Sequence, residues 1–348
     1  PQRHQLPEDS SWAVTVASGP ICHDGVMDLW ELTDLSTPWC VHVVATLRIA
    51  DHLVAGNTQI DRLAAASGAH RDSLHRVLRH LVSKGLFEEP APGVFAMNDV
   101  ARSLLDYPVR LGLDLNGIGG RMAHAWGTLL SAVRTGRPAY HEVFGRGFWE
   151  DLDAHPEIAA SFDALMGPGH GVPDSNVLVN PADWESVKTV VDVGGGTGAM
   201  LAEVLRARPE VRGTLVDLPR TVARSREVFQ AAGVADRVTT VEQSFFDPLP
   251  GGGDLYMLKS VLGDWPDREA AAILKRCAEA ARPSGRVVVF TNAGPGEDAS
   301  PELLMMVLVG GKGRTLEEFR ELAREAGLQV TAVGRQPSGR VIVECRPM

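Results

Sequence analysis

The alternation of apolar and polar residues is clearest over residues 189–217, where a strand, a helix and a second strand follow one another. Residues 189–193 form a β-branched run interrupted by one acid, which is typical of a strand buried in a parallel sheet. From Thr197 the apolar residues recur at helical spacing. The apolar face of this helix consists of Met200, Leu201, Val204 and Leu205. A second apolar run, residues 213–216, ends in Asp217 and completes a predicted βαβ unit.

A glycine-rich turn joins the first strand to the helix. Its glycines are Gly194, Gly195, Gly196 and Gly198. Glycine permits a tight turn and lets a ligand approach bare backbone. The helix N-terminus faces that ligand, and Asp217, 19 residues after Gly198, can accept hydrogen bonds from both hydroxyls of a ribose. The turn and the acid together predict a nucleoside site.

Two nucleoside cofactors suit this spacing. Gly194, Gly196 and Ala199 nearly satisfy the dinucleotide fingerprint, so a nicotinamide cofactor stays open, as does a purely structural turn. S-Adenosylmethionine is favoured by Asp192, because a carboxylate inside the strand could hold the methionine ammonium group. It is also favoured because only one mononucleotide-binding half is detectable, whereas a dinucleotide usually spans two.

Strands and helices continue to alternate after this unit. Helices are expected over residues 219–232, 267–282 and 315–326, and strands over residues 237–242, 254–259 and 286–292. Residues 328–335 and 340–346, separated by Gly339, are expected to form an antiparallel hairpin. The alternation predicts an α/β fold with an open, mainly parallel sheet whose ligands bind at the carboxyl ends of the strands.

The N-terminal third has a winged-helix pattern. Residues 58–67 and 70–84 are expected to form two helices joined at Gly68, and a hairpin is expected over residues 86–97. This pattern raises DNA binding as an alternative. Residues 1–110, however, hold 9 Lys and Arg against 13 Asp and Glu, whereas a DNA reader has a basic surface. We therefore interpret the pattern as a dimerisation module and expect no nucleic-acid partner.

Two further segments carry a heavy apolar load. Residues 38–54 are apolar around nearly their whole circumference if they form one helix, and a short domain cannot cover such a helix, so we expect a subunit partner. Residues 111–172 are expected to be mostly helical, with aromatic side chains that could roof a flat ligand. His124 lies in this second segment, and His170 lies in a glycine-rich loop that we expect near the pocket.

Length, charge and cysteine usage limit the class of protein. The 348 residues are enough for two domains, and the net charge of −10 argues against nucleic acid and anionic membranes as partners. The four cysteines are isolated, as is typical of thiols in a reducing compartment, and no spacing indicates a metal site. Neither a signal-peptide pattern nor an apolar stretch of membrane-spanning length is present, so we expect a cytoplasmic protein.

Seven motifs follow one another along the chain. They are AWGTLLSAVRTGRPAY, VVDVGGGTG, VDLPR, FFDPLP, LKSVLGDWPD, PSGRVVV and GGKGRT. From about residue 26 to the end, the sequence resembles caffeic-acid-type small-molecule O-methyltransferases, especially the actinobacterial branch that tailors aromatic polyketides. The resemblance implies a flexible arm (1–25), a winged-helix dimerisation domain (26–110), a helical linker and substrate roof (111–180) and a class I methyltransferase domain with a Rossmann-like sheet (181–348).

The resemblance also implies S-adenosylmethionine as the cofactor and S-adenosylhomocysteine as the product. The expected cofactor-binding residues are Asp192, Gly194, Gly196, Asp217, Leu218, Ser244, Phe245, Lys259, Ser260 and Trp265. Asp217 is expected to hold the ribose, and Trp265 to close over the adenosine. The family has an acid before the aromatic residue that packs on the adenine, and here Ser244 replaces it before Phe245.

Two departures concern the catalytic pair implied by the family. Gly263 stands where the family has the histidine that takes the phenol proton, and Gly313 stands where it has the glutamate that orients that histidine. The loss of both removes one functional unit, since a base without its orienter is incomplete. The catalytic residue is therefore unassigned, with His170, Asp264 and His124 as weak candidates for a replacement.

The function expected from the resemblance is O-methylation of a phenolic hydroxyl on a small aromatic polyketide-type intermediate, either free or tethered to a carrier protein, by a homodimer. The residues expected to line the acceptor pocket are Trp126, Phe162, Met166, His170, Met305 and Met306. Two alternatives remain. The scaffold could use the cofactor for tailoring without methylation, as a hydroxylase-like relative would, or it could be a winged-helix regulator.

Overall fold

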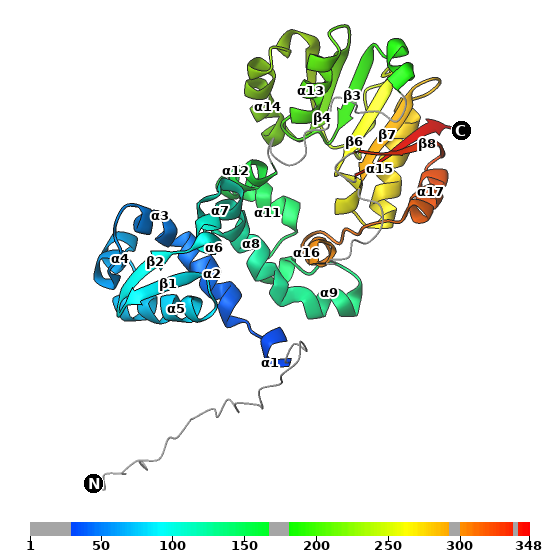
Figure 1. The fold of residues 1–348 in the computed structure, drawn as a ribbon. Coiled ribbons are helices and arrows are strands. Elements are labelled where there is room, and N and C mark those ends of the chain that lie inside the picture. Colours follow the sequence, from blue (N-terminus) through cyan, green and yellow to red (C-terminus); the bar gives the residue numbers. More distant parts are fainter. Residues whose placement is uncertain (1–28, 167–180, 292–299, 337–339) are drawn as a thin grey trace, which may run out of the picture.

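The structure is a computed structural model that describes residues 29–166, 181–291, 300–336 and 340–348 (Figure 1). An N-terminal group of helices with a small hairpin leads through further helices into a sheet with helices on both faces. The predicted arm and His170 lie outside the described residues. Within the described ranges, no helix combines the length and the apolar character that crossing a membrane requires.

Seven strands form the large sheet. They are β3 (Thr189–Val193), β4 (Arg212–Asp217), β5 (Val238–Glu242), β6 (Leu255–Lys259), β7 (Arg286–Thr291), β8 (Leu328–Arg335) and β9 (Val341–Pro347). Their order is β5-β4-β3-β6-β7-β9-β8, in which β9 runs antiparallel to β7 and to β8 and the other pairs are parallel. The predicted α/β fold and the final hairpin are confirmed. The chain builds outward from β3 in both directions, which creates a ligand crevice at the carboxyl ends of β3 and β6.

Two hydrophobic cores lie on opposite faces of this sheet. Helices α13 (Ala199–Ala207) and α14 (Pro219–Ala231) pack on one face, where the predicted apolar face of α13 is buried. Helices α15 (Asp267–Ala280) and α17 (Leu316–Glu325) pack on the other (Figure 1). Because both faces are covered, the central strands are buried along nearly their whole length.

The winged-helix pattern is found close to its predicted position. Helices α4 (Ile60–Ser67) and α5 (Arg71–Ser83) are followed by the antiparallel pair β1 (Phe87–Ala91) and β2 (Val94–Met97). Gly68 ends α4 in the left-handed conformation, at φ 67°, that glycine adopts at low cost. The short helices α1 (Leu29–Leu32), α6 (Asp99–Arg102) and α7 (Tyr107–Leu113) flank this group.

The single helix considered for residues 38–54 is wrong. The segment forms α2 (Ser36–Thr46) and α3 (Ile49–Val54), which are separated at Arg48 in the left-handed conformation, with φ 57°. The break turns α3 so that Val44 of α2 and Ile49 of α3 both reach the same core. The segment is apolar at so many positions because it forms two short helices, each of which buries its own apolar face.

The middle of the chain is helical, as predicted. Its helices are α8 (Ile118–Ala125), α9 (Leu129–Thr135), α10 (His141–Phe144), α11 (Phe148–Ala154) and α12 (Pro156–Leu165). Helix α16 (Ser300–Leu308), which was not predicted, comes from the far end of the chain and inserts Val307 and Leu308 into the core of these helices. We refer to α8–α12 with α16 as the roof.

Ion pairs join the roof to the sheet domain. Asp163 of α12 contacts Arg224 of α14 at 2.6 Å, and Asp153 of α11 contacts Arg220 of α14 at 2.5 Å. Both pairs lie where α14 begins, just after the carboxyl end of β4. They fix the roof over the predicted crevice.

A row of exposed apolar side chains generates the first prediction. Leu29, Leu32 and Leu35 are 61–75% exposed at the start of the described chain, as expected for residues that a second subunit covers. We expect Leu32→Glu with Leu35→Glu to convert a dimer into a monomer in sedimentation velocity. The single change Val333→Glu, at an exposed valine on the edge strand β8, is the control and should leave the mass unchanged. A dimer that survives the double change would contradict the assignment of this surface.

Candidate functional site

The glycine turn after β3 is shaped by what lies beneath it. Gly194, Gly196 and Gly198 adopt left-handed backbone, with φ between 62° and 80°. At Gly195 the reason is space, since a Cβ there would lie 2.5 Å from the carboxylate of Asp192. A side chain at either kind of position would force the turn away from the strand, so the motif requires glycine.

Asp192 lies under this turn and is fully buried. Neither of its carboxylate oxygens makes a hydrogen bond of good geometry within the described part of the chain, although the backbone N–H of Leu201 and the charge of Lys259 lie near enough to lower its pKa slightly. Burial, reinforced by the nearby negative charge of Asp217, raises the pKa of Asp192 to about 7. A buried carboxyl with so little compensation is unfavourable for folding, so its presence beside an open cavity indicates a ligand that binds it.

Asp217 ends β4 with its carboxylate already oriented. The backbone N–H groups of Gly196 and Leu218 donate to its two oxygens at 2.8 Å and 2.7 Å. Burial raises its pKa even though both hydrogen bonds favour the charged form. Each oxygen keeps a second lone pair for an incoming hydroxyl. The side chain is therefore positioned to bind a diol such as a ribose.

The opposite wall of the cavity is aromatic. The ring of Trp265 stands edge-on to those of Phe245 and Phe246, with centroids 5.9 Å and 5.0 Å away. Ser244, which replaces an acid of the family motif, accepts a hydrogen bond from the backbone N–H of Phe246 at 3.2 Å. Such rings offer flat apolar surfaces for a purine base.

One cavity of about 430 Å³ brings these groups together. All the residues that sequence reasoning assigned to the cofactor line it: Asp192, Gly194, Gly196, Asp217, Leu218, Ser244, Phe245, Lys259, Ser260 and Trp265. Phe162 and Met166, assigned to the acceptor, also line it from the roof. The cavity thus spans the crevice of the sheet and the underside of the roof.

Among the lining residues that sequence reasoning did not assign to this cavity are Trp149, Asp163, Arg220 and Arg340. Trp149 stacks on Trp265 with ring centroids 6.2 Å apart, which joins the roof to the aromatic wall. The position of Arg220 in the VDLPR motif, three residues after Asp217, was an available signal. For the other three, the sequence carried no sign of proximity, since each comes from a separate element.

A smaller cavity of about 190 Å³ adjoins the first and shares Ser260 and Asp264 with it. Gly263, Gly313 and Met305 line it, together with Glu302 of α16. A Cβ at Gly313 would collide with the carboxylate of Glu302, whereas a Cβ at Gly263 would meet nothing within 4 Å. The small cavity therefore lies at the two positions where the resemblance implies a missing catalytic pair.

Asp264 forms part of the wall between the two cavities. Its carboxylate makes no hydrogen bond or ion pair to any residue in the described ranges, and burial raises its pKa to about 7. A carboxylate with a pKa near neutrality is suited to accept a proton at physiological pH. Of the weak catalytic candidates, Asp264 is the one that the structure locates in the cavities.

Three other candidates lie elsewhere. The ring of His124 packs against that of Trp39, with centroids 5.1 Å apart, and His124 lines neither cavity. Trp126 and Met306 also line neither, because Trp126 is partly exposed on the roof and Met306 lies on a different side of α16 from Met305. Trp126 and Met306 were expected in the pocket because they are large and apolar, but in the packed structure their side chains lie outside both cavities. Within the described chain, no three His, Cys, Asp or Glu residues could together hold a metal ion.

The buried acid generates a stability prediction. In the unfolded chain Asp192 titrates at about 4, whereas the folded protein holds its proton until about pH 7. The wild type therefore loses stability as the pH rises through this window. We expect Asp192→Asn to raise the thermal midpoint at pH 8 in scanning calorimetry, with an advantage that shrinks toward pH 5. Asp236→Asn, at an exposed acid, is the control, and an unchanged midpoint for Asp192→Asn at pH 8 would contradict the assignment.

Two family models match the chain. An O-methyltransferase dimerisation domain covers residues 30–106, and an O-methyltransferase domain covers residues 126–329. The chain is also 43% identical to the 2,7-dihydroxy-5-methyl-1-naphthoate 7-O-methyltransferase of Streptomyces carzinostaticus, over 87% of this chain and 93% of the relative. It is 40% identical to the aclacinomycin 10-hydroxylase RdmB of Streptomyces purpurascens, over 87% of this chain and 84% of the relative.

Solved structures agree with these matches. A crystal structure of the O-methyltransferase NcsB1 from neocarzinostatin biosynthesis, in complex with S-adenosylmethionine and 2-hydroxy-5-methyl naphthoic acid, has a TM-score of 0.87 and 40% identity. It covers 93% of this chain and 100% of that chain. The chain therefore belongs to the family of S-adenosylmethionine-dependent O-methyltransferases that join a dimerisation domain to a methyltransferase domain.

Proposed function

We propose that this enzyme methylates a phenolic hydroxyl of a small aromatic polyketide-type acceptor, and that Asp264 accepts the proton. The proposal depends above all on one observation. A single cavity of about 430 Å³ is lined at one end by the glycine turn and two acids, and at the other by the aromatic rings of the roof. Such a cavity suits a methyl donor and a flat acceptor side by side.

The residues of the cavity fit S-adenosylmethionine. The orphaned carboxylate of Asp192 suits the methionine ammonium group, while Lys259 suits the carboxylate of the same amino acid. Asp217 would bind the ribose hydroxyls, and Phe245 and Trp265 would pack against the adenosine. Bound there, the cofactor supplies an activated methyl group for transfer to oxygen.

The acceptor side of the cavity is apolar and aromatic. Trp149, Phe162 and Met166 line it from the roof, and Met305 lines the adjoining small cavity. The flat rings suit another aromatic ring, and methionine adapts to varied shapes. The related enzymes named for a naphthoate and crystallised with a naphthoic acid favour a fused-ring phenol. The acceptor is either free or tethered to a carrier protein, and assays should include both forms. The enzyme acts as a homodimer in this proposal.

Alignment provides more of the rate than proton removal. Ionising an ordinary phenol, with a pKa of about 10, at pH 7 costs about 4 kcal/mol. Orientation of two bound reactants contributes about 7–11 kcal/mol, whereas a general base contributes about 10²–10⁴-fold. Position 263 is glycine and cannot act as the general base. Asp264 is the carboxylate best suited to act as the base instead, because it lines both cavities and has a pKa near neutrality.

Product mass tests the reaction type. Incubated with S-adenosylmethionine and a hydroxynaphthoic acid, the enzyme is expected to add one methylene unit to the acceptor and to release S-adenosylhomocysteine. The kinship with a hydroxylase, together with the glycine at position 263, favours one second candidate, a tailoring reaction that adds one oxygen. High-resolution mass spectrometry separates the two, and a gain of oxygen without methyl would overturn the proposal.

The pH dependence tests the proton acceptor. Since the carboxylate form of Asp264 is the base, kcat is expected to rise with pH through about 7, where this group loses its proton. Asp264→Asn should abolish that step and lower kcat at pH 7 by about 100-fold. The remaining rate should follow only the ionisation of the acceptor.

The matched control for this measurement is His124→Gln. His124 is a titratable residue that lines neither cavity, so its replacement should leave both kcat and the pH step unchanged. If the step near pH 7 survives in Asp264→Asn, another group takes the proton and the assignment of Asp264 fails.

A further inference from the structure

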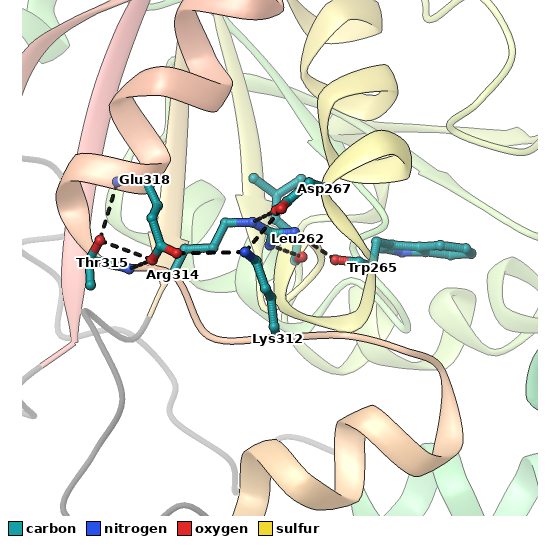
Figure 2. Close-up of polar contacts among 7 residues, drawn as sticks. All are labelled: Leu262, Trp265, Asp267, Lys312, Arg314, Thr315 and Glu318. Atoms are coloured by element: carbon teal, nitrogen blue, oxygen red, sulfur yellow. Dashed lines mark hydrogen bonds and ion pairs between the residues drawn. The ribbon is translucent and has the colours of Figure 1, made fainter. Parts of the chain in front are cut away.

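Arg314 is a charged side chain with only 5% of its surface exposed, directly after the smaller cavity's Gly313. Figure 2 shows its guanidinium at the centre of a cluster of polar contacts. It donates to the backbone oxygen of Leu262 at 2.7 Å, to that of Trp265 at 2.7 Å and to the carboxylate of Asp267 at 2.9 Å. Burial of an arginine is favourable only when its donors are satisfied in this way.

The two carbonyls belong to the two ends of one short segment. Residues 262–265 include the helical turn Leu262–Asp264, and they carry both Asp264 and Trp265. The planar guanidinium is a rigid fork, so two bonds from it fix the separation of its partners as well as their positions. One side chain thus holds both ends of the segment that provides the proposed proton acceptor and the aromatic wall.

The fork is itself held in place. The second oxygen of Asp267 binds Lys312 at 3.0 Å, and Lys312 also lies 3.6 Å from Glu318 (Figure 2). Thr315 and Glu318 form a capping box that starts α17 directly after Arg314. The backbone before and after the arginine is therefore anchored to two helices, α15 and α17.

At position 263 the 262–265 segment has no side chain that could pack against its surroundings. Gly263 has no side chain, and the space around its Cβ position is open. On the other side, a Cβ at Gly311 would collide with the carbonyl oxygen of Gly263 and lie 2.9 Å from the backbone of Asp264. Backbone contacts and the Arg314 fork therefore act together with the packing of Leu262 and Trp265 on either side to determine where Asp264 lies.

We propose that Arg314 is the positioning residue of the transfer site, which sets Asp264 and Trp265 in one geometry at the wall of the cavity. The inference rests on the proposed role of Asp264. Arg314 itself lines only the smaller cavity, so its effect on the reaction passes through the segment that it holds. A lysine keeps the charge but lacks the fork, and cannot bind both carbonyls and Asp267 together.

The test compares Arg314→Lys and Asp267→Asn with the wild type. We expect Arg314→Lys to lower kcat by about tenfold to hundredfold, as the loss of charged hydrogen bonds implies, and to weaken and broaden the pH step near 7. The affinity for S-adenosylmethionine, measured by isothermal titration calorimetry, should fall less than kcat. Asp267→Asn removes the negative charge beside Arg314 and Lys312 and leaves both carbonyl bonds, so its kcat should fall between those of Arg314→Lys and wild type.

Arg268→Gln is the matched control, because Arg268 is also an arginine, is highly exposed and lines neither cavity. It should leave every measurement unchanged. Circular dichroism gives the folded fraction of each variant, and if Arg314→Lys does not fold, Asp267→Asn decides the question by the same criteria.

A folded variant with wild-type kcat and pH step would overturn the proposal. So would a loss of activity that matches the unfolded fraction while the pH step is unchanged, since that is the result of a merely structural role. Failure of the proposed function can be distinguished from failure of this inference. Even if the wild type methylates no phenol, its affinity for the cofactor still depends on the 262–265 segment. In that case Arg314→Lys must weaken cofactor binding relative to Arg268→Gln, and equal affinities would overturn the inference.

Discussion

The burial of a carboxylate without a hydrogen-bond partner in the described chain is the constraint on which the site depends. Asp192 lies inside a central strand, where desolvation disfavours its charge. The turn above it must be glycine, because a side chain at Gly195 would strike the carboxylate. The same turn presents the backbone N–H of Gly196 to Asp217 and so orients the second acid. The buried charge destabilises the free protein, and this cost is consistent with the proposed binding of the ammonium group and ribose of S-adenosylmethionine at these two acids.

The acceptor side depends on a helix from a distant part of the sequence that packs against the roof. Helix α16 follows β7 in the chain, yet packs Val307 and Leu308 among helices from residues 118–165. The ion pairs from α11 and α12 to α14 bind the same roof to the cofactor side. Because the roof is attached at both places, packed elements set its position over the cavity, which suits the alignment-driven catalysis that we propose.

Local patterns allowed much of this arrangement to be predicted from sequence. Strand β3, the glycine turn and Asp217 are specified by residues close in the chain, and the residues assigned to the cofactor do line one cavity. Long-range packing could not be predicted. Helix α16, the stacking of Trp149 on Trp265 and the carboxylate of Glu302 at Gly313 each join segments far apart. Trp126 and Met306 failed as pocket residues because apolar composition gives no direction for a side chain.

Gly263 and Gly313 line the same small cavity, but they differ in how much space surrounds their Cβ positions. The resemblance assigns a histidine to position 263 and a glutamate to position 313, and only the first has free space around its Cβ position. A histidine at position 263 would meet no neighbouring atom at its Cβ, whereas a glutamate at position 313 would require the flexible side chain of Glu302 to move and would bring two carboxylates close together. Replacement of Gly263 therefore demands only space, whereas replacement of Gly313 demands a rearranged and more negatively charged cavity.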